Sequence, residues 1–498
     1  LVFIILDPIE YKNNMISIKN FKLDRKKNIT LLNKDLINFI NSFVSDNDFN
    51  FFSKKSSECL NLKRETIINE SKVFIFRNFI NKYGKFKKII SNNYLKYFLI
   101  NFLLLNYIFI FRKKKPIEKK KYDLVIDLTQ DTQYDYFEKI SKKLNSIFIL
   151  NKKDERYNFF IFKKFNRYSL PNNCKRYIDF LKLIFWFLNF SFKKKVNFNY
   201  ILFHFFYIYF RNHSIFLNIE AKFLIQERYN FTSPIKNEIF KTHGGILSTV
   251  VQRNIFQRNG PGMLIYSDVI FSLGEETCKI LEDLDGEVKE IHPVGSLFME
   301  KNYFDRPNSS INSSKIHTYD LLVVAAPHVW NFISGYERYY DDYYLHFEWI
   351  KKFAIENPDL KIGIKHKNKL ENPKELKIFE KIDNVFHLID ETKWKDTYLF
   401  GKNAKSICTW SSTLGHEFLS IKKECYYVDP DYNNQSFLPN YDFYKPLRLN
   451  TYEKFVNTIK SQIRGEKNMS VLNNSDKFCL SSENVSQKIA KFFQDRLK

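Results

Sequence analysis

Short apolar runs and amphipathic segments alternate along most of the chain. The runs have the length of buried strands, and the segments between them carry apolar residues at helical spacing. Strands that alternate with helices form a parallel sheet with helices on both of its faces. In the first part of this region, the predicted strands are 122–128, 146–150, 221–227, 246–253, 268–274 and 288–296.

The same alternation restarts after residues 305–315, which read DRPNSSINSSK and contain few large apolar residues, as is typical of a linker. Beyond this segment, strands are predicted at 319–328, 360–367, 384–390, 404–410 and 424–430, with helices over 336–358 and 412–423. We therefore predict an α/β chain with two doubly wound, Rossmann-like domains, at residues 121–304 and 316–480. A basic, aromatic and partly helical extension over residues 1–120 precedes them.

The basic charge of the chain is concentrated in its first half. The formal net charge is +24. Residues 1–218 contain 41 Lys and Arg against 18 Asp and Glu, a net charge of +23, whereas residues 219–498 contain 38 against 37. This asymmetry predicts an anionic partner for the N-terminal half, either a phospholipid surface or nucleic acid. No RNA-recognition, helix-turn-helix or zinc-finger pattern favours nucleic acid.

Two aromatic stretches with basic flanks favour the phospholipid surface. Residues 94–121 contain an apolar run from Tyr97 to Phe111, which is shorter than the roughly 20 residues that a spanning helix needs. Residues 176–214 repeat the pattern. Such segments suit the headgroup layer, with Lys at the phosphates; the alternative is that both are ordinary core helices. The six Cys form no CxxC pair, which fits a reducing cytoplasm. Together with the basic charge and the two aromatic stretches, this predicts a cytoplasmic protein that is bound peripherally at the inner face of the plasma membrane.

Small hydroxylated residues follow the apolar run SICTW in the second predicted domain. Ser411, Ser412 and Thr413 come first, and Gly415 lets the backbone approach a ligand as the next helix begins. Ligands of doubly wound sheets bind outside the carboxyl ends of the strands, and free N–H groups at a helix start bind anions. The segment therefore predicts a phosphate site, while N-capping by Ser or Thr is an equally good interpretation.

Further polar residues are expected at the same edge of this domain. Lys365 and His366 follow the strand-like LKIGI, where a cation and an imidazole suit a diphosphate; a solvated basic turn is the alternative. Glu417 is placed to accept hydroxyl groups of a sugar or ribose, although acids are common in first helical turns. His243 precedes the strand-like ILSTVV. No two His have metal-binding spacing, and no GxxxxGK[ST] or GxGxxG motif is present, so neither a metal nor NTPase or dinucleotide chemistry is expected.

The order of these segments resembles that in GT-B-fold transferases of bacterial surface polysaccharides. That group includes CDP-glycerol glycerophosphotransferase-like and capsule-type glycosyltransferases. The similar segments, within residues 221–430, are GGILSTVVQRN, SDVIFSLGEETCKIL, VKEIHPVGS, LLVVAAPH, IGIKHK and SICTWSSTLGHEFLSIKKECYYVDP. Two loops depart from the family pattern. The Gln-His-Gly of the family reads Gln-Arg-Asn at residues 252–254, and its Lys-x-His-Pro keeps the His but not the Pro at residues 365–367.

The resemblance implies a transferase that moves a sugar or an alditol phosphate from a nucleotide-activated donor to a membrane-associated surface-glycan acceptor, without a cofactor. Its partners would be a nucleotide-sugar or CDP-alditol donor, a lipid-linked or polysaccharide acceptor and an anionic membrane surface. The alternatives are a sugar-nucleotide epimerase, which shares the fold, and a non-catalytic membrane-binding or glycan-binding scaffold. The predicted site residues are His243 and His366 as catalytic, Lys365, His366, Ser411, Ser412, Thr413, Gly415 and Glu417 as donor-binding, and Gln252, Arg253, Gly295 and Ser296 in the cleft.

Overall fold

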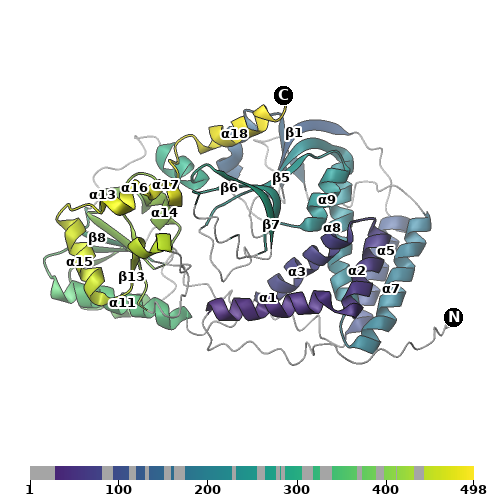
Figure 1. The fold of residues 1–498 in the computed structure, drawn as a ribbon, viewed down its shortest axis with the longest axis horizontal. Helices are drawn as coiled ribbons and strands as arrows, with labels where there is room; N and C mark the ends of the chain where they lie inside the picture. The colour runs from purple at the N-terminus through teal and green to yellow at the C-terminus, as the bar shows by residue number, and fades with distance from the viewer. Residues whose placement is uncertain are drawn as a thin grey trace.

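The helices and strands of the chain form a seven-stranded sheet, a six-stranded sheet and a group of helices beside the seven-stranded sheet (Figure 1). The structure is a computed structural model. It describes residues 29–498 apart from residues 81–92, 112–118, 129–133, 151–158, 162–173, 227–231, 255–263, 276–280, 282–285, 306–317, 326–338, 367–372, 389–396, 411 and 431–441.

The seven-stranded sheet is parallel throughout, in the order β3-β2-β1-β4-β5-β6-β7. Its strands are β1 (Lys120–Asp127), β2 (Ser146–Leu150), β3 (Phe159–Ile161), β4 (Ile219–Gln226), β5 (Leu247–Val251), β6 (Tyr266–Ser272) and β7 (Glu287–Pro293). Short helices connect them: η3 (Tyr134–Phe137), α6 (Glu138–Ser141) and α9 (Pro234–Thr242). The central strands are buried over their last four residues or more, because helices cover both faces of the sheet.

The six-stranded sheet is also parallel, in the order β10-β9-β8-β11-β12-β13. Its strands are β8 (Leu321–Val324), β9 (Ile362–Lys365), β10 (Val385–Leu388), β11 (Ser406–Thr409), β12 (Tyr426–Val428) and β13 (Arg448–Leu449). Its helices are α11 (Tyr339–Glu356), α12 (Pro373–Ile378), α13 (Thr397–Asn403), α14 (Leu414–Leu419), η13 (Asp442–Leu447), α15 (Tyr452–Ile463), α16 (Met469–Asn473) and α17 (Ser475–Phe478).

Both sheets have the same doubly wound strand order, in which the direction of winding reverses beside the first strand. The reversal lies between β1 and β4 in one sheet and between β8 and β11 in the other. Ligands of such sheets bind at the carboxyl ends of the strands that flank the reversal. The predicted fold class is therefore confirmed: the chain has two doubly wound, Rossmann-like sheets with a helical, basic N-terminal extension. The sequence pattern did not predict β3 and β13, which have only three and two residues.

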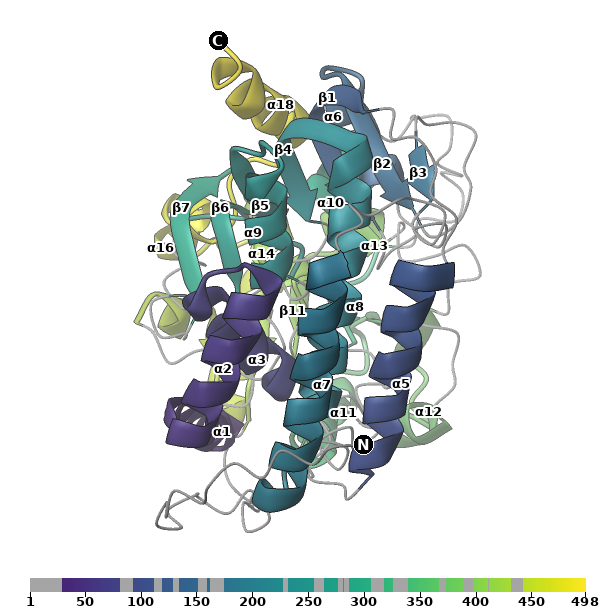
Figure 2. The same ribbon diagram turned by 90° about the vertical axis from the view of Figure 1, so that its right-hand side faces the viewer.

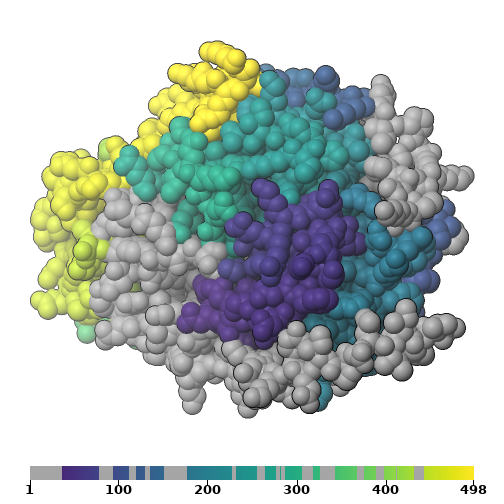
Figure 3. Space-filling view, turned by 45° about the vertical axis from the view of Figure 1, so that its right-hand side comes forward, coloured from purple at the N-terminus to yellow at the C-terminus, as the bar shows by residue number. Residues whose placement is uncertain are grey.

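The N-terminal helices pack against two helices that are inserted between β3 and β4. The first group is α1 (Ile29–Ser45), α2 (Asn47–Leu60), α3 (Arg64–Ile80), α5 (Tyr94–Asn106) and the π-helix η2 (Tyr107–Phe111), and the inserted helices are α7 (Cys174–Lys194) and α8 (Phe198–Asn218). Figure 3 shows the purple N-terminal helices against the teal insertion. One continuous core joins them, with rings such as Phe52, Phe187 and Phe205 fully buried. The two aromatic stretches of the sequence thus belong to one unit.

The end of the chain crosses back from the six-stranded sheet to the seven-stranded sheet. Helix α18 (Val485–Asp495) packs against α6, β4 and β6, at the top of the view in Figure 1. The ring centroids of Phe493 and Phe223 lie 4.9 Å apart, and those of Phe492 and Phe271 lie 5.0 Å apart. Burying each such ring contributes on the order of 2 kcal/mol. The crossing therefore fastens the two sheets to each other at a second place besides the linker.

Between the two sheets, α10 (Leu297–Met299) and the π-helix η8 (Glu300–Phe304) follow β7. Residues 306–315 of the predicted linker lie outside the described residues, so the linker and the domain boundaries stay predictions. Among the described helices, none combines the length and the apolar character that crossing a bilayer requires.

Candidate functional site

The carboxyl edges of the two sheets meet at a buried carboxylate. Ser296, which follows β7, donates a hydrogen bond from Oγ to Glu417 in the first turn of α14, after β11. The Tyr398 hydroxyl donates to the other carboxylate oxygen of Glu417 at 2.9 Å. Burial raises the pKa of Glu417 to about 7, although the two hydroxyls oppose the rise. In this arrangement both oxygens of Glu417 accept protein hydroxyls, so its predicted bond to hydroxyls of a donor stays a prediction.

Gly295 and Ser296 contact residues 480–482, in the segment that leads from the six-stranded sheet to α18. Gly295 has φ +99°, and a Cβ there would lie 2.9 Å from the carbonyl oxygens of Leu480 and Ser481. Only glycine tolerates that backbone conformation so close to another backbone. The Ser296 N–H donates to Ser482 Oγ at 3.0 Å. The structure thus places this predicted pair at the junction of the two domains.

The stretch SSTLG begins α14 at the carboxyl end of β11. Ser411 lies outside the described residues. Ser412 Oγ accepts the Leu414 N–H at 3.3 Å, and Thr413 precedes the six-residue helix without a side-chain cap. A Cβ on Gly415 would lie 2.5 Å from the hydroxyl oxygen of Tyr427. The glycine therefore makes room for the Tyr427 ring, and among the described residues Ser412 acts as the capping interpretation predicts.

Lys365 and His366 lie at the carboxyl end of β9, the neighbour of β8. Lys365 is buried, with Nζ 3.1 Å from the carbonyl oxygen of His366. Because β8 and β11 flank the winding reversal, the structure brings Lys365 and His366 to the same edge of the sheet as Ser412 and Thr413. This is the placement that the sequence predicts for a donor site.

Hydrogen bonds connect His366 to two further titratable side chains, Glu375 and His387. His366 Nδ1 lies 2.7 Å from Glu375 Oε2 on α12, and His366 Nε2 lies 2.9 Å from His387 Nδ1 on β10. Glu375 also accepts the Tyr343 hydroxyl at 2.8 Å. Glu375 and His366 are buried, and His387 is half-buried. Burial, and next the neighbouring His366, lower the pKa of His387 to about 4.

The hydrogen-bond partners determine which ring nitrogens of His366 and His387 carry a proton. Since the Glu375 carboxylate is an acceptor, His366 carries its proton on Nδ1. Neutral His366 then accepts at Nε2 from His387 Nδ1–H, which leaves a lone pair on His387 Nε2. A proton that arrives at His387 Nε2 adds a positive charge to the histidine pair, which the Glu375 carboxylate contacts through His366. Among the residues that the structure describes, His387 Nε2 has no hydrogen-bond partner.

His243 lies elsewhere. It follows α9 and precedes β5, at the amino edge of the seven-stranded sheet, and its Nε2 is 2.9 Å from Nδ1 of His213 on α8. The five residues of β5 span about 15 Å, which separates His243 from Gln252 at the carboxyl end. Burial, and next Lys119, lower the pKa of His243. The structure does not bring His243 together with the other predicted site residues, and its catalytic role stays a prediction.

Gln252 and Arg253 occupy the carboxyl end of β5. The Gln252 side chain accepts the Leu273 N–H at 2.9 Å and donates to the Asn254 carbonyl oxygen at 3.0 Å, so it fixes the loop. The Arg253 guanidinium lies 4.2 Å from the ring centroid of Phe298, just after β7. The Arg253 guanidinium therefore packs on an aromatic ring of α10, which follows β7.

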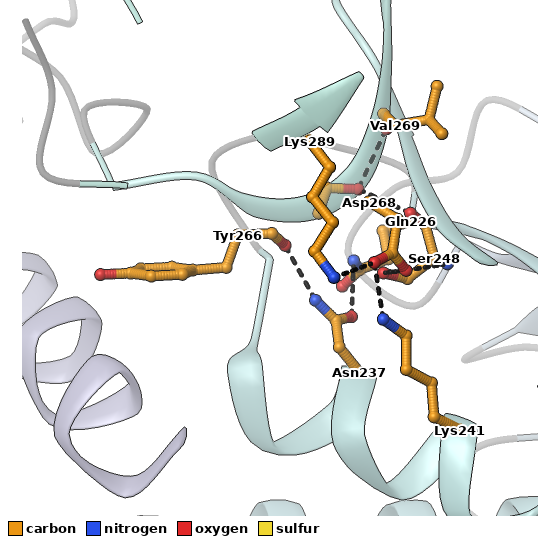
Figure 4. A network of polar contacts seen from close by, with 9 residues as sticks. Gln226, Asn237, Lys241, Ser248, Tyr266, Asp268, Val269 and Lys289 are labelled. Carbon is orange, nitrogen blue, oxygen red and sulfur yellow. Dashed lines mark hydrogen bonds and ion pairs between the residues drawn. The ribbon is translucent and has the colours of Figure 1, made fainter. Parts of the chain in front are cut away.

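Asp268, the acid of SDVIFSLG, has a structural role at the opposite edge. It accepts the N–H and hydroxyl of Ser248 at 2.9 and 3.1 Å, and pairs with Lys241 at 2.6 Å and Lys289 at 3.3 Å (Figure 4). Burial raises the pKa of Asp268, but the bonds from Lys241 and Ser248 outweigh it and lower the pKa. The network ties β5, β6, β7 and α9 together.

Sequence reasoning missed Glu375 and His387, and also a buried ion pair at the reversal of the larger sheet. There, Asp127 at the end of β1 pairs with Lys236 of α9 at 2.7 Å. The sequence offered two weak signals: Asp127 lies near the carboxyl end of the predicted strand 122–128, and His387 lies in the middle of the predicted strand 384–390. Among the described side chains, no group of three His, Cys, Asp or Glu is arranged to hold a metal ion.

Comparison with protein families and with curated protein sequences finds no match. Solved structures that match include S. aureus MnaA with UDP, at 13% identity and TM-score 0.41 over 75% of this chain and 97% of that one. UDP-GlcNAc 2-epimerase from Neisseria meningitidis matches at 8% identity and TM-score 0.43, over 76% and 100%. The wall teichoic acid polymerase TagF, soaked with CDPG, matches at 11% identity and TM-score 0.41, over 84% and 98%. At these values, no activity of those proteins is transferred to this chain.

Proposed function

We propose that the protein is a GT-B transferase that moves a sugar or an alditol phosphate from a nucleotide-activated donor to a membrane-associated glycan acceptor. The six-stranded domain binds the donor at the carboxyl ends of β8, β9 and β11. The seven-stranded domain binds the acceptor. The order of the sequence segments supports the class of enzyme, and the residues gathered at the edge of the six-stranded sheet support the place of the donor.

The chain Glu375–His366–His387 is the observation that carries this proposal. Removing a carboxylate and an imidazole from water costs several kcal/mol unless they are paired. A stack of aliphatic residues would hold α12 on the sheet at lower cost. Buried titratable groups in contact at a strand edge are typical of acid–base sites. A non-catalytic scaffold gives no reason for this arrangement.

The chemistry follows from the charge that develops in transfer. When the bond from the donor's transferred group to its phosphate oxygen breaks, negative charge appears on the leaving nucleotide phosphate. The acceptor oxygen bonds to the transferred group and releases its proton to water. His387 Nε2, when protonated, donates to the leaving phosphate oxygen, and the Glu375 carboxylate stabilises the positive charge on the histidine pair that this state requires. Fixed donors aimed at developing charge are a large source of rate enhancement.

The proposal is tested by titrating the protein with a panel of nucleotide sugars and CDP-alditols in a calorimeter, and by mass spectrometry of products formed with a lipid-linked glycan. We expect binding of at least one donor and a product heavier by the transferred group. If the folded protein binds none of the donors, it is a scaffold. If it converts a sugar nucleotide without any acceptor, it is an epimerase. Either result overturns the proposal.

A further inference from the structure

Half of the large apolar side chains that the structure records as exposed lie on two neighbouring helices. Among the described residues, sixteen such side chains are exposed, and eight of them belong to α5, η2 and α7. Leu103 is 66% exposed, Ile110 57% and Phe192 56%. We call the following set the α5–α7 ridge: Leu95, Leu99, Leu103, Tyr107, Ile110, Ile178, Phe185 and Phe192.

The ridge is continuous because its two helices pack against each other in opposite directions. Ring centroids lie 5.1 Å apart for Tyr94 and Phe192, and 4.8 Å apart for Phe98 and Phe185. At the other end, Tyr177 donates to Asn106 at 2.8 Å. The exposed residues of α5 recur every four positions and those of α7 every seven, so each set follows one side of its helix. Figures 1 and 2 show both helices at the end of the molecule far from the six-stranded sheet.

The two amide side chains of α5 do not contribute to the ridge. Asn101 is fully buried and donates to the Asn199 carbonyl oxygen of α8 at 2.9 Å. Asn106 is bonded to Tyr177, as above, and to the Phe102 carbonyl oxygen at 2.7 Å. An amphipathic helix of a soluble domain has the opposite arrangement, with its amides outside and its leucines inside. The outer face of α5 is therefore shaped for contact with an apolar phase.

Basic side chains surround the ridge. Lys96 on α5, Lys182 and Lys193 on α7, and Lys195 just beyond it are all exposed, whereas Asp179 is the one exposed acid among the described residues of these two helices. A second copy of the chain seated on the ridge would bring these lysines against their own equivalents. An anionic surface instead neutralises them. The charge therefore favours phospholipid over self-association.

We propose that the α5–α7 ridge docks the protein on an anionic bilayer, with its leucine, isoleucine and phenylalanine side chains in the headgroup–acyl boundary and its lysines at the lipid phosphates. The helices lie in the plane of the membrane and do not cross it. The ridge belongs to the helical unit attached to the seven-stranded domain, so docking holds the proposed acceptor side toward the lipid. The inference rests on the proposed function only for that last point.

The test uses flotation with vesicles of neutral phosphatidylcholine and with vesicles that contain 30% phosphatidylglycerol. We compare the full chain with a variant that carries Leu95→Gln, Leu99→Gln and Leu103→Gln. Ile355→Gln and Met469→Gln are matched controls, because these residues are exposed to a similar extent on the six-stranded domain. Glutamine keeps helix propensity, and thermal melts confirm that each variant is folded.

We expect the unchanged chain to bind the anionic vesicles, less so in 0.5 M NaCl, and the triple variant to lose about tenfold or more in partitioning. The controls should bind as the unchanged chain does. Three results overturn the inference: no binding by the unchanged chain, equal binding by the triple variant, or a dimer that the triple substitution dissociates while vesicle binding persists. Donor titration of the same variants is independent of lipid, so failure here and failure of the proposed function are distinguishable.

Discussion

Two pairs of histidines make the same contact at opposite edges of the two sheets. His213 Nδ1 and His243 Nε2 lie 2.9 Å apart at the amino edge of the larger sheet, and His366 Nε2 and His387 Nδ1 lie 2.9 Å apart at the carboxyl edge of the smaller one. Burial, and next His243, lower the pKa of His213 to about 3. Only the second pair has a carboxylate, Glu375, in hydrogen-bond contact among the described residues.

The difference shows that contact geometry does not by itself make a site. Without a carboxylate, a buried imidazole pair resists a proton and behaves as a polar packing contact. In the second pair Glu375 opposes this effect, although burial still lowers the pKa of His387 to about 4. The edge matters as well, because the carboxyl ends of a doubly wound sheet are where its ligands bind. Three predictions test this comparison.

The largest effect is expected from the carboxylate and the outer imidazole. Glu375→Gln keeps the shape but removes the charge, and His387→Asn removes the group that faces outward. Each is expected to lower kcat/KM for transfer about a hundredfold, in the range of a lost charged hydrogen bond or acid–base group. Initial rates at saturating acceptor measure this. An equal loss in His243→Asn would restore the catalytic role predicted for His243 and would remove the distinction between the two pairs.

The pH dependence of stability should have opposite signs at the two edges. The folded pKa of His213 lies below its unfolded value of 6.5, so its stability contribution is complete above about pH 6.5 and falls as the pH is lowered. The folded pKa of Glu417 lies above its unfolded value of 4.5, so its contribution is complete below about pH 4.5 and falls as the pH rises through 7. Each group changes the unfolding free energy by about 2 kcal/mol between pH 5 and pH 7.

Urea unfolding of Glu417→Gln and His213→Asn across that range checks these slopes. Because the two contributions oppose each other over this range, we expect the stability of the glutamine variant relative to the unchanged chain to rise toward pH 7, and that of the asparagine variant to rise toward pH 5. If neither slope changes relative to the unchanged chain, the buried carboxylate and the amino-edge imidazole are both accessible to water. The predicted opposite pH dependences of Glu417 and His213 would then be wrong.

The smallest effect is expected from the start of α14. Ser412→Ala removes the acceptor of the Leu414 N–H and should lower the unfolding free energy by about 0.5–1 kcal/mol, the usual value for a lost cap. Ser420→Ala, at the other end of α14, is the control, since its hydroxyl donates to the Glu417 carbonyl oxygen at 2.7 Å. A loss of donor affinity in Ser412→Ala at unchanged stability would favour the phosphate interpretation of SSTLG.

Much of the fold was predictable because each strand can be inferred from a short stretch of its own sequence. The apolar composition of the runs that form β1, β9 and β11 predicts that these strands are buried. Their alternation with helices predicts that the strands are parallel. The predicted positions of Lys365 and His366 at a carboxyl edge followed from that alone. The return of α18 to the other sheet did not, because Phe492 and Phe493 find their partners more than 200 residues earlier in the chain.

The sequence by itself determined the two doubly wound sheets, the basic first half and the residues that end β9 and β11. Tertiary structure alone decided which of these residues have partners. Glu375 reaches His366 only when α12 packs on the sheet, and His387 reaches it only when β10 pairs with β9. Composition marked α5, α7 and α8 alike as aromatic, yet packing buried most of α8 and left three of the five leucines of α5 exposed. The physical reason is that hydrophobicity is a property of a side chain, whereas burial is a property of its neighbours.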